Sequence, residues 1–280
     1  MEMSNQKKLV KWFLFRIPLA LILIFILIPF IWAVITSFKT KDVITGMNIS
    51  LLPNPVTFEN YVNVWKVSKF SSYFINSLYV SFIALVIIVV CSVLNGYALA
   101  RYKFRGKNIF MMLLIGTQLM PVIILIIPLF VIFKQMGLVN NRWSLIIFYI
   151  AMQIPFNSIL MKGFVSGIPV AVEEAAWVDG ASRTKTAIYI LLPMLLPGIV
   201  ATGAFAFVSC WNEFMVSFSF LTSQKLFTIP VGLKYMIGEY TIDYGSLAAG
   251  SIIALIPPVI LFAYIQKYLV NGLGAGAIKG

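Results

Sequence analysis

The side chains that usually carry catalysis are scarce in this sequence. It contains no histidine, nine acidic residues and two cysteines, Cys91 and Cys210, which both lie within apolar runs. No GxxxxGK[ST] phosphate loop, GxSxG turn or paired-carboxylate arrangement occurs, so we do not expect the chain to hydrolyse a nucleotide in the P-loop manner. No Cys and His cluster has metal-ligand spacing. The sequence therefore predicts a non-enzymatic protein that binds no cofactor or metal itself.

A second group of polar side chains lies inside long apolar runs. A polar group costs free energy there, so it usually lines a cavity or joins two helices. The group comprises Asn76, Gln118, Gln153, Asn157, Asn212, Glu213 and Gln266, and all but Gln153 and Gln266 are our candidates for a substrate path. Glu213 is either an interfacial carboxylate with local partners or part of that path. The aromatic residues near it either mark the membrane interface or form a sugar-stacking surface.

The most distinctive polar stretch is EEAAWVDGASRTKTAIYILLP, residues 173–193. Pro169 can begin a helix, because its missing N–H is not needed in the first turn. Glu173 and Glu174 then lie in the early turns, where the helix dipole favours negative charge. The pattern predicts a helix that starts near Pro169.

Small and turn-forming residues complete this stretch. Ala175 and Ala176 allow another surface to approach closely, and Asp179-Gly180 is a turn signal that ends the helix. Ser182 is placed to cap a second helix over 183–192. We expect a helix–turn–helix along the membrane face, either as a plain amphipathic connector or as a surface that a partner binds.

The elements that position these residues are long apolar runs. The chain is 61% hydrophobic and 11% charged, whereas a soluble domain is about 45–50% apolar and about 25% charged. Runs of about 20 apolar residues predict transmembrane helices. We expect an all-α, polytopic membrane protein with six spans, at about 17–38, 73–95, 109–133, 143–161, 194–218 and 246–270. A basic segment over 1–16 precedes this membrane domain (17–270, with its polar loop at 169–193), and a tail over 271–280 follows it.

The basic residues predict the orientation of the spans. The net charge of +12 could indicate nucleic acid, but the positive residues flank apolar runs, where they set membrane orientation. The side that holds both termini and the loops 96–108 and 162–192 carries more Lys and Arg than the other side. We therefore expect both termini and the loop 169–193 to face the cytoplasm, in a cell (plasma or inner) membrane protein.

The polar loop resembles a known signature. It reads EAA-x3-G-x9-I-x-L-P, with Glu174-Ala175-Ala176 at its start, and is similar to the EAA motif of ABC-importer permease subunits. Other passages resemble the carbohydrate-importer (MalG-like, binding-protein-dependent) branch: SSYFINSLYVS (71–81), NGYALARYKFRGK (95–107), IPFNSILMKGF (154–164), LLPMLLPG (191–198), WNEF (211–214), TIPVGL (228–233) and NGLGAGAIKG (271–280). The resemblance covers about residues 9–280.

This resemblance implies a MalG/MetI-like type I importer permease fold and a role for the loop. Its first helix would be a coupling helix that seats on an ATPase subunit through Glu173, Glu174, Ala175, Ala176, Asp179 and Gly180. The implied partners are a second homologous permease, two ATP-binding-cassette ATPase subunits that hold ATP and Mg, an extracellular solute-binding protein, a carbohydrate (probably an oligosaccharide by the resemblance alone) and lipid. The loop around 219–245 would contact the binding protein, through Lys225, Thr228, Tyr235 and Tyr240.

Three alternatives remain at this point. The chain could be a permease of the same ABC type that imports a different solute. It could be a secondary carrier, although such a carrier needs an intramembrane ion site and usually repeat symmetry. It could also be a non-transporting scaffold for another membrane complex.

Overall fold

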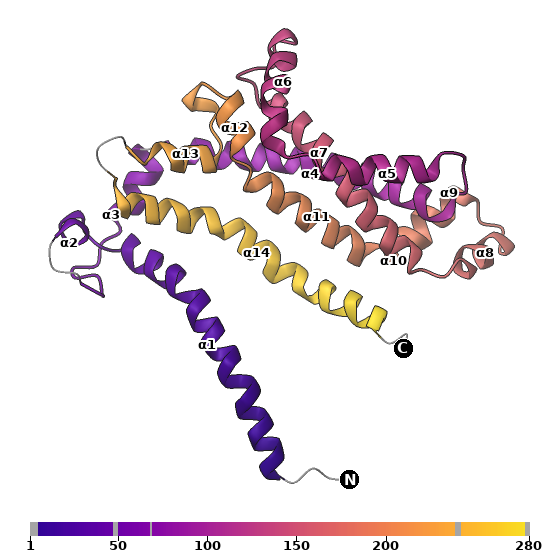
Figure 1. Ribbon diagram of the computed structural model, residues 1–280, viewed down its shortest axis with the longest axis horizontal. Coiled ribbons are helices and arrows are strands. Elements are labelled where there is room, and N and C mark those ends of the chain that lie inside the picture. Colours follow the sequence, from indigo (N-terminus) through magenta and orange to yellow (C-terminus); the bar gives the residue numbers. More distant parts are fainter. Residues whose placement is uncertain (1–4, 47–49, 68, 239–241, 278–280) are drawn as a thin grey trace. The chain divides into compact units, whose positions relative to one another are not determined.

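The computed structural model describes residues 5–46, 50–67, 69–238 and 242–277. Within these ranges the secondary structure is helical, apart from one isolated antiparallel bridge between Ile237 and Ile242. The chain forms two compact units, Met1–Phe70 with Tyr235–Leu255, and Ser71–Lys234 with Ile256–Gly280. Figure 1 labels the helices of both units.

The first unit contains a long apolar helix and three short helical segments. They are α1 (Asn5–Ser37), α2 (Lys41–Thr45), α3 (Glu59–Val62) and the π-helical turn η1 (Asn63–Val67), and the first turns of α14 (Tyr244–Ala277) join them. The buried Asn60 fixes the end of α1, because its amide donates to the carbonyls of Ser37 (2.9 Å) and Lys39 (2.8 Å). The backbone acceptors that α1 leaves free at its end are thereby satisfied.

The second unit holds the remaining helices. In chain order they are α4 (Phe70–Arg101), α5 (Lys107–Gln118), α6 (Val122–Gln135), α7 (Arg142–Ser166), α8 (Ala171–Val178), α9 (Arg183–Lys185), the π-helical segment η2 (Thr186–Leu191), α10 (Leu192–Met194), α11 (Leu196–Trp211), α12 (Met215–Phe220), the 3₁₀ turn η3 (Gln224–Leu226), α13 (Ile229–Tyr235) and the later turns of α14. Glycines bring α4 and α11 close to α7. A Cβ at Gly96 would lie 2.7 Å from Cγ of Met161, and one at Gly198 would lie 2.6 Å from Cγ of Phe164.

In the part of the chain that the structure describes, four helices are long and apolar enough to cross a membrane: Trp12–Ser37, Phe70–Arg101, Arg142–Ser166 and Tyr244–Lys267. Two bent pairs raise the number to six if each pair is one span. The pair α5 and α6 bends by 98°, and the pair Arg183–Met194 and Leu196–Trp211 bends by 71°. The six-span prediction is confirmed when the bent pairs are counted in this way.

Two of the predicted spans are not continuous helices. The third, expected over 109–133, breaks between Gln118 and Val122, because Pro121 is extended (φ −61°, ψ 127°) and cannot donate a backbone N–H. The helix of the fifth ends at Trp211, before a break at residues 212–214. Each of these two predicted spans thus consists of more than one helix, and the site described below lies at both breaks.

Candidate functional site

The polar loop forms the helical hairpin that its sequence predicts. Helix α8 ends in a Schellman motif, in which Ala181 N–H donates to the carbonyl of Ala176 (2.9 Å) and Gly180 N–H donates to that of Trp177 (3.1 Å). Gly180 has a φ of +84°, a conformation that only glycine adopts without strain. The turn signal at Asp179-Gly180 is thereby confirmed.

The second arm of the hairpin begins at the predicted cap. Ser182 Oγ accepts from the backbone N–H of Lys185 (3.3 Å), so the expected cap is present. The arm itself differs from the continuous helix expected over 183–192, since a single turn of α9 passes into the π-helical η2. The guanidinium of Arg183 lies 5.1 Å from the ring centre of Trp177, and this contact joins the two arms.

One face of α8 is fixed to the membrane helices. The carboxylate of Glu173, which is 1% exposed, accepts from Arg101 Nε in a buried ion pair and from the hydroxyl of Tyr97 (3.0 Å). Arg101 also donates from Nη2 to the carbonyl of Ile168 (2.8 Å). Below these contacts lies an apolar cluster of Met161, Val165, Ile168, Leu191 and Leu195. The ion pair and the cluster together hold α8 at the ends of α4 and α7.

The opposite face of α8 is exposed. It presents Glu174, Ala175 and Val178, of which Val178 is 87% exposed, and the turn adds Asp179 and Gly180. The predicted ATPase-contact set is therefore divided between two faces. Glu173 and Ala176 lie on the buried face, so their assignment as surface contacts is corrected. The reason is the helical period of 3.6 residues, which places positions 173 and 176 on one side and 174 and 178 on the other.

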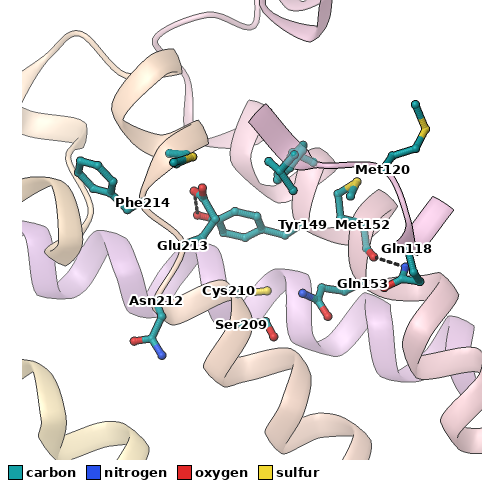
Figure 2. Close-up of a pocket in the computed structure, with 13 residues that line it drawn as sticks. Gln118, Met120, Tyr149, Met152, Gln153, Ser209, Cys210, Asn212, Glu213 and Phe214 are labelled. Atoms are coloured by element: carbon teal, nitrogen blue, oxygen red, sulfur yellow. Dashed lines mark hydrogen bonds between the residues drawn. The ribbon is translucent and has the colours of Figure 1, made fainter. Parts of the chain in front are cut away.

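A cavity of about 590 Å³ lies elsewhere in the second unit. Figure 2 draws its lining residues as sticks. They are Gln118, Met120, Val122, Phe148, Tyr149, Met152, Gln153, Ser209, Cys210, Asn212, Glu213, Phe214 and Met215. Of the predicted path residues, Gln118, Asn212 and Glu213 belong to this lining. Figure 2 also shows that the Asn212 amide is directed away from Glu213 and Tyr149.

The cavity coincides with both helix breaks. Gln118 ends α5 and Val122 begins α6, while residues 212–214 separate α11 from α12. Irregular backbone at membrane depth is tolerated only where protein buries it or where it lines a water-filled cavity. In transporters such interrupted helices surround the substrate site. The breaks and the cavity therefore point to the same place.

Glu213 has its partners within the chain. One carboxylate oxygen accepts from Val216 N–H (2.7 Å), and the other accepts from Ser217 N–H (3.0 Å), Ser217 Oγ (2.9 Å) and the hydroxyl of Tyr149 (3.1 Å). The carboxylate thus caps the first turn of α12. Glu213 therefore has local partners and also lines the cavity, and its role in a substrate path stays a prediction.

The other two predicted path residues do not line the cavity. Asn76 is buried, donates to the carbonyls of Lys225 (2.8 Å) and Phe227 (3.0 Å), and accepts from Arg142 Nη1 (3.2 Å). Asn157 is fully buried and donates to the carbonyl of Gln153 (2.8 Å). Both amides donate to carbonyls of this chain, and Asn157 keeps a buried Oδ1 without a hydrogen-bond partner among the described residues. Because neither residue lines the cavity, we withdraw both from the path.

The predicted binding-protein loop is only partly available at the surface. Lys225 and Tyr235 are exposed, whereas Thr228 is 4% exposed and its side chain cannot meet a partner in this conformation. Tyr240 lies outside the described residues. The buried Asn76 holds this segment through the carbonyl groups of residues 225 and 227, a contact that no local sequence signal indicated.

Comparison with known proteins identifies the family. Residues 92–274 match the family described as "Binding-protein-dependent transport system inner membrane component". The probable ABC transporter permease protein YurM of Bacillus subtilis (strain 168) is 38% identical over 94% of this chain and 87% of the relative. The trehalose/maltose transport system permease protein MalG of Thermococcus litoralis is 34% identical over 98% of this chain and 99% of the relative.

A solved structure shows the same fold. It is a bacterial ABC transporter involved in the import of the acidic polysaccharide alginate, with a TM-score of 0.82, 21% identity and coverage of 96% of this chain and 100% of that chain. The protein belongs to the family of binding-protein-dependent transport system inner membrane components. It is a multi-pass membrane protein, and the resemblance to ABC-importer permeases is confirmed.

Proposed function

We propose that this chain is the permease subunit of an ATP-driven, binding-protein-dependent carbohydrate importer. The observation that carries the proposal is the two-faced helix α8, which is fixed to the membrane helices on one side and presents Glu174, Ala175 and Val178 on the other. Small residues beside an exposed carboxylate suit a groove on another protein that contains a basic side chain. The relative MalG is named as a permease of a trehalose/maltose transport system, which supports the same conclusion.

This proposed function implies several protein partners. Two ATPase subunits would bind ATP and Mg, and one of them would receive α8. A second, homologous permease would complete the translocation path. A solute-binding protein would dock on the opposite side, where Lys225 is exposed. In this arrangement α8 and both termini face the cytoplasm, in agreement with the distribution of Lys and Arg.

Transport would proceed by alternating access. Closure of the ATPases on ATP moves the two coupling helices together, and the bound nucleotide thereby favours one of two orientations of the membrane helices. The cavity between the helix breaks would be exposed to one side of the membrane in each orientation. In this proposal the contribution of the chain to transport is mechanical.

The lining of the cavity favours an uncharged sugar. The amides of Gln118 and Gln153 can donate to and accept from hydroxyl groups, and Phe214 offers an aromatic face. Among the lining residues Glu213 is the one charged side chain, and no Lys or Arg is present to pair with an acidic sugar. We therefore propose neutral oligosaccharides, such as the trehalose and maltose named for a relative.

A charge reversal on α8 tests the coupling role. In proteoliposomes that contain the complete transporter, Glu174→Lys should reduce binding-protein-stimulated ATP hydrolysis, with trehalose and maltose as probes, by about tenfold or more, because a cation would face the basic partner. Glu59→Lys reverses another exposed carboxylate, in the first unit, and serves as the matched control. Stimulated hydrolysis that Glu174→Lys leaves unchanged contradicts the proposal.

The substrate class is tested separately. Cells that express the whole transport system should take up trehalose or maltose, and uptake of an alginate disaccharide should be at least about tenfold slower, because its carboxylates would meet Glu213 without a cation. Equal uptake of the acidic disaccharide contradicts the assignment to neutral sugars but leaves the coupling role of α8 intact.

A further inference from the structure

We propose that α4 transmits the displacement of the coupling helix α8 to the other side of the membrane. It does so through a buried polar joint, a set of hydrogen-bonded side chains, at each of its ends. Arg101 and Tyr97 form the first joint with Glu173, and Asn76 forms the second with the 225–227 segment. These are positioning residues, since none of them lines the cavity. The inference rests on the proposed function and adds the route by which the chain performs it.

The first joint sets the rotation of α8. The side chains of Arg101 and Glu173 are 10% and 2% exposed, so neither charge can be left to water when the other is removed. Separating a buried pair in this way is strongly destabilising, because one charge stays buried without compensation. Arg101 in addition binds the carbonyl of Ile168, which immediately precedes the hairpin. While the pair is intact, Glu174 and Val178 must point outward, and a displacement of α8 must displace the end of α4.

The second joint lies at the other end of the same helix. Residues 76 and 101 are separated by about 37 Å at about 1.5 Å per residue. There the Asn76 amide binds the carbonyls of Lys225 and Phe227, and Ser77 Oγ accepts from Ile229 N–H (2.8 Å). A hydrogen-bonded amide that is 5% exposed has no water to replace its partners, so this segment must follow α4.

Helix α4 is also the element best suited to transmit a displacement. Prolines stand inside each of the three other long spans, at Pro18 and Pro29 of α1, Pro155 of α7, and Pro257 and Pro258 of α14. No proline stands inside α4, whose 32 residues form one uninterrupted helix. Proline removes a helical hydrogen bond and permits bending. An uninterrupted helix with a joint at each end therefore moves as one body. Such a connection is needed because spatial proximity alone would not establish coupling between α8 and the 225–227 segment.

The test measures a fluorescence change at the second joint while residues of the first joint are substituted. The complete transporter, in nanodiscs without the binding protein, carries Cys91→Ala and Cys210→Ala, and a fluorophore on Lys225→Cys. The probe is Mg-AMP-PNP, which binds to the ATPase subunits, and nucleotide occupancy is measured in the same samples. No sugar is needed, so an error in the assigned substrate does not affect the result.

In the parent we expect the nucleotide to change the fluorescence at position 225. Arg101→Gln and Glu173→Gln should each reduce this change by about tenfold at equal occupancy, and the double variant should be no worse than either single variant, because both act on one joint. The charge exchange Arg101→Glu with Glu173→Arg should restore at least about half of the change. Lys103→Gln removes an exposed cation from the same segment and should have no effect.

Three outcomes overturn the inference. They are an unchanged signal in both single variants, losses that add in the double variant, and a charge exchange without any recovery. If Arg101→Gln does not assemble, Tyr97→Phe removes a single donor from Glu173, and it should give a smaller loss of the same signal. A parent chain that binds no ATPase subunit overturns the proposed function itself, and with it this inference.

Discussion

The role of Glu213 can be tested by changing one carboxylate oxygen into an amide. In Glu213→Gln one oxygen still accepts from Val216 N–H, but an NH₂ group can replace the oxygen that faces Ser217 N–H at 3.0 Å. The hydroxyls of Tyr149 and Ser217 can rotate to accept from the new amide, whereas the backbone N–H of Ser217 cannot. One hydrogen bond is therefore lost at the first turn of α12, and the bond from Val216 N–H that remains has a neutral acceptor.

The expected loss of stability in α12 follows from the one hydrogen bond that is lost. A hydrogen bond to a charged group contributes about 1.5–3 kcal/mol, and about 1.4 kcal/mol corresponds to a factor of ten in an opening equilibrium. The backbone amides of Met215–Phe220 should then exchange with deuterium about 10- to 150-fold faster in Glu213→Gln than in the parent. Because the carboxylate is partly exposed to the cavity, we expect the lower half of this range.

Hydrogen exchange followed by mass spectrometry on the complete transporter in nanodiscs gives this measurement. Asn212→Ala is the matched control, since it changes the exposed neighbour and should leave exchange over α12 within about threefold of the parent, as expected for a surface substitution. Unchanged exchange in Glu213→Gln would refute the capping role. Faster exchange over α11 and α12 together would show a general loss of stability and would refute the local account.

Two further predictions concern glycines, each with a control elsewhere in the chain. Gly180 and Gly137 both have positive φ, +84° and +68°, so alanine at either position should lower the free energy of unfolding by about 1–2 kcal/mol. Of the two variants, only Gly180→Ala should also reduce stimulated ATP hydrolysis. An equal reduction in Gly137→Ala would contradict the specific role of the hairpin. A Cβ at Gly232 would lie 2.2 Å from Cδ2 of Tyr73, whereas one at Gly203 meets its nearest side chains at 3.6 Å. Gly232→Ala should therefore lower the Tm in detergent, and Gly203→Ala should raise it because alanine favours the helix by about 0.5–1 kcal/mol; shifts of the same sign would contradict this packing argument.

Features with local causes could be predicted from the sequence. Apolar runs of about 20 residues indicate spans because each must cross a bilayer about 30 Å thick. The hairpin could also be predicted because its causes are local: Gly180 determines the turn and Ser182 the cap, through their own backbone and nearest neighbours. The exposed side of α8 could not be predicted, because Glu173 turns inward toward Arg101, which lies 72 positions earlier in the chain.

The helix breaks show a second limit of prediction from the sequence. Pro121 breaks a span, yet Pro128 and Pro155 stand inside α6 and α7 without ending either helix. A proline in an apolar run therefore does not reveal whether the freed backbone groups find partners nearby. At the break before α12 a carboxylate supplies them, and this could be recognised only once Glu213 was placed beside Val216 and Ser217.

A polar residue in a membrane span is therefore weak support for a substrate path until its partners are known. Asn76 and Asn157 use their amides on backbone carbonyls, and Glu213 uses both of its oxygens on α12. An amide offers two donors and an oxygen with two lone pairs. Gln118 contributes one donor to the carbonyl of Met152, at 3.4 Å, so it retains capacity toward the cavity. Sugar hydroxyls should thus be recognised by the glutamine side chains of the cavity, while the carboxylate beside them keeps the broken helix in place and disfavours an acidic sugar.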